Sequence, residues 1–285
     1  DHGLGESALN CFQRMQENAV DSDAVTFACV LKSCSITESI ALGQALHAQI
    51  LKNGFEKDPF IANSLMDMYL KCCFLHEAKE IFDRLPKKDV ISWTALINGY
   101  AEHGSTEEAW NCFVQMQSEG IYPNVITYVC ILRACGSMRE TKKGQKIHSI
   151  IIEEGFEGDS SICSNLVGMY AKCGLLLEAE GTLDDLAVRD LFSWNALVSG
   201  YLDQGQCDKA LSCSKKIQEE FLHLDVATYV CSLKACGNIL DVKKAEEIYD
   251  FIFKEGLLDE NDIIGTALVD MCMACGMLEK AQEVF

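Results

Sequence analysis

Hydrophobic and polar positions along the chain follow the periodicity of short amphipathic helices, and glycines separate one helical stretch from the next. From position 90 the segment VISWTALINGYAEHG places Leu96, Ile97 and Tyr100 at helical spacing and stops at Gly104. The next segment, STEEAWNCFVQMQSEG, starts with a Ser–Thr cap followed by two glutamates and ends at Gly120. This pattern predicts two short antiparallel helices in succession, and strand signals are scarce throughout the chain.

The same pattern recurs with a period of 101 residues. The segment VTFACVLKSCS begins at position 25, ITYVCILRACG at 126 and ATYVCSLKACG at 227, so each copy starts 101 residues after the previous one. Within a period the hydrophobic starts of successive helix pairs divide the chain into lengths of 35, 35 and 31 residues. Self-similar units of about 20–50 residues are typical of solenoids, in which each unit packs on its neighbours. We therefore predict an all-α, right-handed solenoid superhelix of helix-turn-helix repeats that forms a single array over residues 1–285.

This register predicts seven complete units and two partial ones. The complete units are 24–58, 59–89, 90–124, 125–159, 160–190, 191–225 and 226–261, and the partial units are 1–23 and 262–285. Because the chain opens and closes within a unit, we expect it to be a fragment of a longer protein. The lack of a targeting segment therefore says nothing about its destination.

Composition excludes several classes of protein. A hydrophobic content of 49% is too high for a disordered chain, and no apolar run reaches the roughly 18 residues that span a membrane. The chain has 16 cysteines, but equivalent ones such as Cys34, Cys135 and Cys236 would lie far apart in a solenoid. We expect buried thiols in a reducing compartment rather than disulfides. The lone C-x-x-C of Cys272 and Cys275 lacks two further ligands, so no metal site is predicted.

Catalytic motifs are absent from the sequence. It contains no G-x4-G-K-[ST], H-E-x-x-H or G-x-S-x-G, and the H-x-E and P-C-x-x-C pattern of zinc deaminases is missing as well. His47 and His148 occupy one repeat position, but Tyr249 takes it in the third copy. A metal ligand or general base would not tolerate that exchange, so we interpret both histidines as packing residues. We expect no enzyme and no cofactor in this chain.

Two positions in each unit vary while the surrounding scaffold repeats. The fifth residues are Ala28, Asn63, Thr94, Val129, Ser164, Asn195, Val230 and Thr266. The last residues are Asp23, Asp58, Asp89, Asn124, Asp159, Asp190, Asp225 and Asn261. Short polar side chains at two adjacent points can hydrogen-bond the edge of one unstacked base, but an Asp or Asn before a helix is also a normal N-cap. Residue chemistry alone leaves both interpretations open.

The division into 35, 35 and 31 residues resembles the pentatricopeptide repeat family, specifically its plant organellar subclass built from P, L and S motifs. DVISWTALINGYAEHGSTEEAWNCFVQMQ resembles a P motif, GQALHAQILKNGFEKD the end of an L motif, and NSLMDMYLKC with HEAKEIFDRLP an S motif. The W-x2-L-G-x2-Y pattern of tetratricopeptide repeats is not found. The resemblance covers essentially the whole chain. It implies binding of single-stranded RNA at one base per repeat, with capping as a second role of the aspartates.

The resemblance also implies which base each pair recognises, because in this family Asn with Asp favours U, Thr with Asn favours A, and Ser or Thr with Asp favours G. The implied base-recognition residues are Asn63 with Asp89 for U, Thr94 with Asn124 for A, Ser164 with Asp190 for G, Asn195 with Asp225 for U, and Thr266 in the last partial unit. Ala28, Val129 and Val230 of the L units cannot hydrogen-bond a base, so we expect spacers there. We expect Asn63, Thr94, Ser164 and Asn195 to be exposed, and Trp93 and Trp194 to pack between helices.

The second residue of each first helix lies where the family sandwiches the base. The residues implied for this role are Val25, Phe60, Ile91, Ile126, Phe192 and Ile263. Phenylalanine and isoleucine can make such stacking or apolar contact. Ser161 and Ala227 depart from the pattern, which weakens the expectation for their two units.

A net charge of −19 opposes a role in RNA binding, because nucleic-acid binders usually carry a basic footprint. The first thirteen residues of the eight first helices nevertheless carry as many positive as negative charges. The phased cations are Lys32, Arg133 and Lys234 at position nine and Lys71 and Lys172 at position thirteen. They lie four and eight residues beyond position five, on the same helix face, and we expect them to contact the RNA backbone. The alternative is an ordinary solubilising surface.

The leading hypothesis is a sequence-specific single-stranded RNA binder, the targeting array of a plant organellar C-to-U editing factor. The expected partners are organellar RNA in a mitochondrion or chloroplast and editing-factor proteins, with no membrane. Occupying a transcript to stabilise or process it is a less typical RNA role. The alternative from another class is a protein-interaction solenoid, which would suit the acidic surface.

Overall fold

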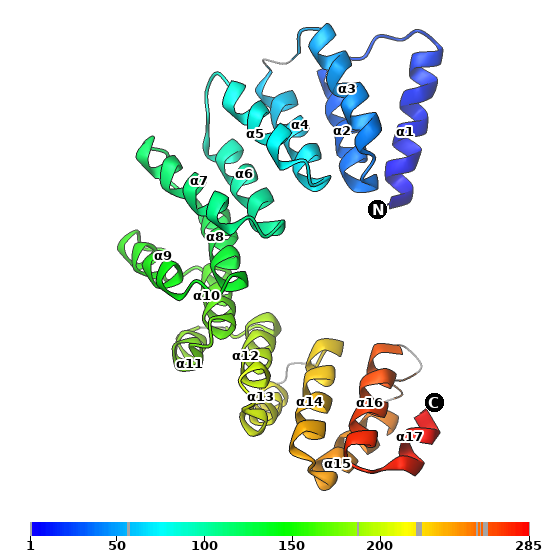
Figure 1. Cartoon of the computed structure of the whole chain (residues 1–285), viewed down its shortest axis with the longest axis vertical. Helices are drawn as coiled ribbons and strands as arrows, with labels where there is room; N and C mark the ends of the chain where they lie inside the picture. The colour runs from blue at the N-terminus through cyan, green and yellow to red at the C-terminus, as the bar shows by residue number, and fades with distance from the viewer. Residues whose placement is uncertain are drawn as a thin grey trace. The chain divides into compact units, whose positions relative to one another are not determined.

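The computed structural model describes residues 2–55, 58–186, 188–220, 224–254, 256, 258 and 262–284. Every regular element over these residues is a helix (Figure 1). The helices are α1 (His2–Glu17), α2 (Ala24–Thr37), α3 (Ile40–Lys52), α4 (Pro59–Lys71), α5 (Leu75–Arg84), α6 (Val90–Glu102), α7 (Thr106–Ser118), α8 (Val125–Ser137), α9 (Thr141–Glu153), α10 (Ser160–Lys172), α11 (Leu176–Asp184), α12 (Leu191–Asp203), α13 (Cys207–Glu219), α14 (Val226–Ile239), α15 (Val242–Lys254), α16 (Asp262–Ala274) and α17 (Leu278–Val284). The even-numbered helices from α2 to α16 begin at the first residues of the predicted units. The all-α repeat fold expected from the sequence is confirmed.

The chain divides into two compact units, Asp1–Ala134 and Cys135–Phe285, and the division falls within α8. Inside the first unit α2 packs on α4 and α4 on α6, while each also packs against the second helix of its own repeat. Inside the second unit α10, α12, α14 and α16 stack in order in the same way. In each compact unit the first helices are therefore central to the packing, since each contacts another first helix and the second helix of its own repeat.

Helix ends follow the glycines that the sequence pattern marks. Gly104 ends the α6 segment with a φ of 74°, and Gly120 ends the α7 segment with the same value. These left-handed conformations cost glycine nothing, since it has no Cβ. The chain reverses at each of them to start the next helix.

Aromatic and aliphatic side chains fill the space between consecutive helices. Trp93 is fully buried, and its ring lies 4.5 Å from that of Phe82 in an edge-on arrangement. Trp194 is 3% exposed, and its indole Nε1 donates to Glu220 Oε2 at 2.9 Å. The expectation that both tryptophans pack between helices is confirmed.

The two repeated histidines have structural partners. His47 Nδ1 lies 2.9 Å from the hydroxyl of Tyr69, and His148 Nδ1 lies 2.6 Å from that of Tyr170. In the third copy the hydroxyl of Tyr249 donates instead to Glu283 Oε2 at 2.9 Å. Burial lowers the pKa of both histidines, which keeps the rings neutral. Their interpretation as packing residues agrees with these contacts.

Half of the cysteines are buried like small apolar side chains, whereas Cys11, Cys29 and Cys73 are exposed, contrary to the expectation of buried thiols. All 16 are free thiols, and Cys34, Cys135 and Cys236 are buried. Burial raises the pKa of Cys34 to about 11, that of Cys135 to about 12 and that of Cys236 to about 11. Thiols with such values are poor nucleophiles. Among the described residues no group of three or more His, Cys, Asp or Glu side chains is arranged to hold a metal ion.

Candidate nucleic-acid interface

The last residue of each unit caps the first helix of the next one. Asp89 Oδ1 accepts from the backbone N–H of Ser92 at 2.9 Å, and Asn124 Oδ1 accepts from that of Thr127 at the same distance. The aspartates that cap helices in this way are Asp23, Asp58, Asp89, Asp159, Asp190 and Asp225. Asn261 lies outside the described residues. Capping, one of the two interpretations that the sequence left open, is confirmed, and it fixes these side chains beside the fifth residues.

In unit 191–225 the two predicted base-recognition residues touch. Asn195 Nδ2 donates to Asp225 Oδ1 and Oδ2, each at 3.0 Å. The hydroxyl of Thr228, the third residue of the next unit, donates to Asn195 Oδ1 at 2.6 Å and also lies 2.8 Å from Asp225 Oδ1. Burial alone would raise the pKa of Asp225, but its hydrogen bonds from Thr228 and Asn195 outweigh that effect and lower it. The carboxyl group is therefore ionised at neutral pH and can only accept hydrogen bonds.

Unit 90–124 has the same three-residue arrangement with different side chains. Thr94 Oγ1 lies 2.7 Å from Thr127 Oγ1, and Thr127 Oγ1 donates to Asn124 Oδ1 at 2.9 Å. Because the single proton of the Thr127 hydroxyl goes to Asn124, the Thr94 hydroxyl donates to Thr127. Among the hydrogen bonds of the described residues, none joins Thr94 to Asn124 directly. Thr127 joins them.

Unit 160–190 brings two hydroxyls to one carboxylate. Ser164 Oγ donates to Asp190 Oδ2 at 2.9 Å, and Ser193 Oγ donates to Asp190 Oδ1 at 2.6 Å. Burial raises the pKa of Asp190, but the hydrogen bonds from Ser193 and Ser164 more than offset it, so that the pKa lies below its usual value. Together with the backbone N–H of Ser193, three protein donors thus bond the Asp190 carboxylate.

In unit 59–89 the fifth residue is left without such a partner. Asn63 Oδ1 is buried and accepts no hydrogen bond within the described part of the chain. The hydroxyl of Ser92 donates instead to the backbone oxygen of Asp89 at 3.0 Å and accepts from its N–H, forming a capping box. The two pairs of identical type, Asn63 with Asp89 and Asn195 with Asp225, therefore differ in their hydrogen bonding.

One sequence expectation about these residues is wrong. Thr94 and Ser164 are buried, with 8% and 4% of their surface exposed, whereas both were expected to be exposed. Their short side chains turn into the clusters with Thr127 and Asp190, which satisfies their hydroxyls inside the protein. Asn63 and Asn195 are partly exposed, and Thr266 is exposed, with its hydroxyl donating to Asp262 O at 3.0 Å.

Large apolar side chains at the second position face solvent. Their exposed fractions fall between 58% and 62% for Val25, Phe60, Ile91, Ile126, Phe192 and Ile263. Ser161 and Ala227, which occupy the same position, are exposed too. Each of these residues lies three positions before a fifth residue on the same helix face. Each first helix with such a residue thus presents an apolar side chain to solvent beside its fifth residue.

The five phased cations are all exposed on first helices. They are Lys32 on α2, Lys71 on α4, Arg133 on α8, Lys172 on α10 and Lys234 on α14. Lys71 pairs with Asp67 one turn earlier at 2.9 Å, so part of its charge is already neutralised. Whether these side chains contact an RNA backbone stays a prediction.

Sequence reasoning missed the third residue of each following unit. A hydroxyl residue stands there after every complete S and P unit, namely Ser92, Ser193, Thr127 and Thr228, and isoleucine stands there after the L units, namely Ile61, Ile162 and Ile264. The fifth residue is polar in the first group and apolar in the second. This match between two positions was visible in the sequence. Its meaning depends on the third and fifth residues being in contact across units.

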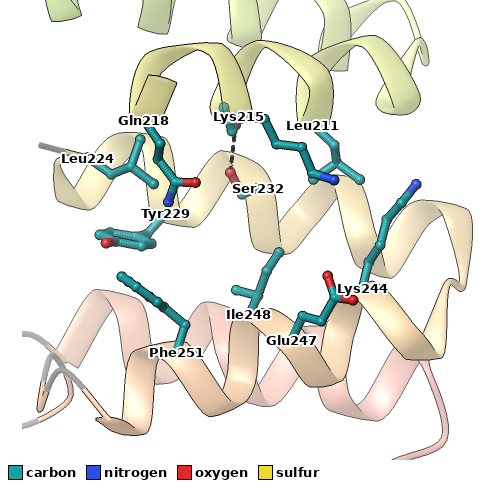
Figure 2. A pocket seen from close by; sticks show the side chains of 11 residues that line it. Leu211, Lys215, Gln218, Leu224, Tyr229, Ser232, Lys244, Glu247, Ile248 and Phe251 are labelled. Atoms are coloured by element: carbon teal, nitrogen blue, oxygen red, sulfur yellow. Dashed lines mark hydrogen bonds between the residues drawn. The ribbon is translucent and has the colours of Figure 1, made fainter. Parts of the chain in front are cut away.

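A pocket of about 190 Å³ opens between α13, α14 and α15, within the second compact unit (Figure 2). Ser214 and Ser232 line it with their hydroxyls 2.8 Å apart, and so do Tyr229 and Phe251, which stack with ring centres 6.1 Å apart. One period earlier the positions of the two serines hold Phe113 and Ile131, and both of these side chains are buried. The two serines that line the pocket are much smaller than the residues at these positions one period earlier.

Comparison with known proteins gives the class of this chain. Residues 88–137 match the PPR repeat family, and residues 60–90, 161–191 and 192–220 match the PPR repeat. A chloroplast pentatricopeptide repeat-containing protein of Arabidopsis thaliana is 31% identical over 99% of this chain and 33% of its own length. The chain belongs to the pentatricopeptide repeat family.

Further comparisons agree on the fold. A putative mitochondrial pentatricopeptide repeat-containing protein of Arabidopsis thaliana is 28% identical over 98% of this chain and 46% of its own length. The crystal structure of the pentatricopeptide repeat protein PPR10 in complex with an 18-nucleotide psaJ RNA element matches with a TM-score of 0.72 and 17% identity, over 99% of this chain and 46% of that one. The chain thus spans between a third and a half of the relatives it matches. None of its described helices is both long and apolar enough to cross a membrane.

Proposed function

We propose that this chain binds single-stranded RNA in a sequence-specific manner, with one base for each unit. The observation that carries the proposal is the recurrent pairing of an exposed apolar side chain at position two with a polar cluster three residues further along the helix. An unstacked base needs an apolar surface against its face and hydrogen-bonding groups at its edge. Units 59–89, 90–124 and 191–225 offer both within one turn of a helix.

The pairs formed by the fifth and last residues of the units give an expected RNA target. With the 5′ end of the RNA at the N-terminus of the protein, the seven complete units select n-U-A-n-G-U-n, in which n marks each L unit. The pairs that carry this choice are Asn63 with Asp89, Thr94 with Asn124, Ser164 with Asp190, and Asn195 with Asp225. Position-two side chains cover the base faces, and the five phased cations contact the phosphates.

The alternation of 35, 35 and 31 residues favours the P, L and S subclass, and with it the targeting array of a C-to-U editing factor. The relatives named as chloroplastic and mitochondrial support a location in one of these organelles. The structure of PPR10 with its RNA supports RNA as the partner through a shared fold. Editing-factor proteins are the further partners that this role requires.

The test is selection from a randomised RNA pool with the purified chain, followed by measurement of binding to the selected and scrambled sequences. Enrichment of n-U-A-n-G-U-n with weaker binding to a scrambled control supports the proposal. Equal binding to all sequences, or no binding at all, contradicts it.

A protein-interaction scaffold is the second candidate function. The net charge of −19 and the open pocket beside Tyr229 and Phe251 are the observations that favour it. The same chain is therefore also screened against a pool of peptides. Retention of a peptide family together with no RNA enrichment would favour the scaffold.

A further inference from the structure

We propose that the hydroxyl at the third position of the following unit is a positioning residue for base recognition. It fixes which atoms of the fifth and last residues can donate to a base and which can accept. This inference rests on the proposed function and adds residues that the pairs alone do not include. The best-defined cases are Thr228 beside Asn195 and Asp225, and Thr127 beside Thr94 and Asn124.

The orientation of the Asn195 amide follows from its neighbours. An ionised carboxylate can only accept, so Nδ2 rather than Oδ1 must face Asp225, as the two distances of 3.0 Å show. Oδ1 then faces Thr228, whose hydroxyl has one proton and lies 2.6 Å from Asn195 Oδ1 and 2.8 Å from Asp225 Oδ1. The shorter distance favours donation to Asn195 Oδ1. Thr228 is fully buried, so its hydroxyl cannot turn to solvent instead.

This arrangement has a consequence for the base. One N–H of Asn195 can serve both oxygens of Asp225, which leaves the second N–H for a ligand, while Oδ1 is withdrawn from it. The cluster thus offers a donor beside a carboxylate acceptor. Uracil presents an oxygen acceptor beside the N3–H donor and is complementary to it. Cytosine presents a donor at N4 beside an acceptor at N3 and is mismatched at both points.

The same reasoning in unit 90–124 selects a different base. Asn124 Oδ1 accepts from the backbone N–H and the hydroxyl of Thr127, which turns its Nδ2 away as a donor. The Thr94 hydroxyl donates its hydrogen bond to Thr127 and keeps a lone pair that can accept one from a base. Asn124 Nδ2 can then donate to N1 of adenine, and Thr94 Oγ1 can accept from the N6 amino group. Guanine has a donor at N1 and an acceptor at O6, and it is mismatched at both points.

Unit 59–89 supplies an internal comparison. Its pair, Asn63 with Asp89, is of the same type as Asn195 with Asp225, but the Ser92 hydroxyl donates to the backbone of Asp89 and leaves Asn63 Oδ1 without a donor. We therefore expect the second nucleotide of the target to show weaker discrimination of U from C than the sixth nucleotide. The pairs of residues alone predict equal discrimination at these two places.

The experiment measures affinities of the 285-residue chain for RNAs that carry U or C at the sixth nucleotide, with the rest of the target unchanged. Thr228→Val keeps the shape of the side chain and removes the hydroxyl. It is expected to reduce the U-to-C affinity ratio roughly three- to tenfold, the scale of one hydrogen bond. The ratio at the second nucleotide should stay unchanged. Thr228→Ser, which keeps the hydroxyl, should retain the wild-type ratio.

Ser92→Ala is the matched control, because it removes a hydroxyl at the equivalent position that does not bond the fifth residue. It should leave the U-to-C ratio at the second nucleotide unchanged. If Thr228→Val unfolds the chain, Thr127→Val provides the same test through the A-to-G ratio at the third nucleotide.

The outcomes separate this inference from the proposed function. A wild-type chain with no preference for U at the sixth nucleotide overturns both. A wild-type preference for U that Thr228→Val preserves, or that Thr228→Ser loses equally, overturns the inference alone. If Thr228→Val lowers the melting temperature or weakens binding to all RNAs but leaves the U-to-C affinity ratio unchanged, the role of Thr228 is purely structural. That result also overturns the inference.

Discussion

Asn195 and Asp225 stand 30 residues apart in the chain and are joined by hydrogen bonds of 3.0 Å from the amide nitrogen to both carboxylate oxygens. The contact forms because Asp225 caps α14, which packs beside α12, the helix that carries Asn195. Asp225 thus caps α14 and also forms a hydrogen-bonded pair with Asn195. Four predictions follow from this arrangement and from the rest of the structure.

The first prediction concerns the register of the repeats. Asn124→Asp replaces a side chain that donates and accepts with one that only accepts. The third nucleotide of the target should shift from A toward G, because guanine presents a donor at N1 where adenine presents an acceptor. The loss of affinity for the original RNA should be about 1–3 kcal/mol, the scale of one misread base. Selection from a randomised RNA pool measures the shift.

Two results would contradict this prediction in different ways. A change of preference at another nucleotide would mean that the register of the units is wrong. Equal weakening of all sequences would mean that Thr94 and Asn124 have only a structural role in this chain.

The second prediction concerns salt. With five phased cations, the plot of log K against log[salt] for single-stranded RNA should have a slope of about −3 to −4. Lys234→Ala should make that slope shallower by about 0.7 and weaken all sequences alike. Lys52→Ala, which removes an exposed cation from the second helix α3, is the control and should have little effect. A wild-type slope near −10 would show that the positive charge lies elsewhere.

The third prediction concerns acid stability. The folded pKa of Asp225 and of Asp190 lies below the ordinary value of about 3.9, although burial alone would raise it. A carboxyl group whose pKa is lower in the folded state stabilises the fold at pH values above its unfolded-state pKa. This stabilisation is lost as the pH falls through the folded-state pKa. Thermal unfolding between about pH 5 and pH 2 should therefore show a falling melting temperature. Asp225→Asn should make that fall less steep, and an unchanged slope would contradict the assignment.

The fourth prediction concerns the pocket between α13, α14 and α15. Ser214→Phe with Ser232→Ile restores the residues found one period earlier and should stabilise the chain by about 1 kcal/mol, the usual scale for filling a cavity. The reciprocal change Phe113→Ser should destabilise it by about 3 kcal/mol, because it opens a cavity in a filled site. Denaturant unfolding measures both. Destabilisation by the double variant would show that the pocket cannot accept these side chains.

The sequence alone determined the helical repeat and the family. The 101-residue period, the glycine stops and the aspartate caps depend on local conformational preferences, and the first helices begin where the repeat units were expected to begin. The exposed apolar residues at position two and the buried tryptophans also followed, because helical periodicity fixes which side of a helix each residue occupies.

Only the tertiary structure decided how the polar residues bond to one another. Thr94 and Ser164 are buried because neighbouring units bring Thr127 and Asp190 within hydrogen-bonding distance. Asn63 and Asn195 are identical in sequence terms, yet only Asn195 receives a hydroxyl donor. Such differences depend on atomic positions set by the packing of one helix on the next. Local sequence preferences do not fix contacts between residues some 30 positions apart, so the packed fold alone determines them.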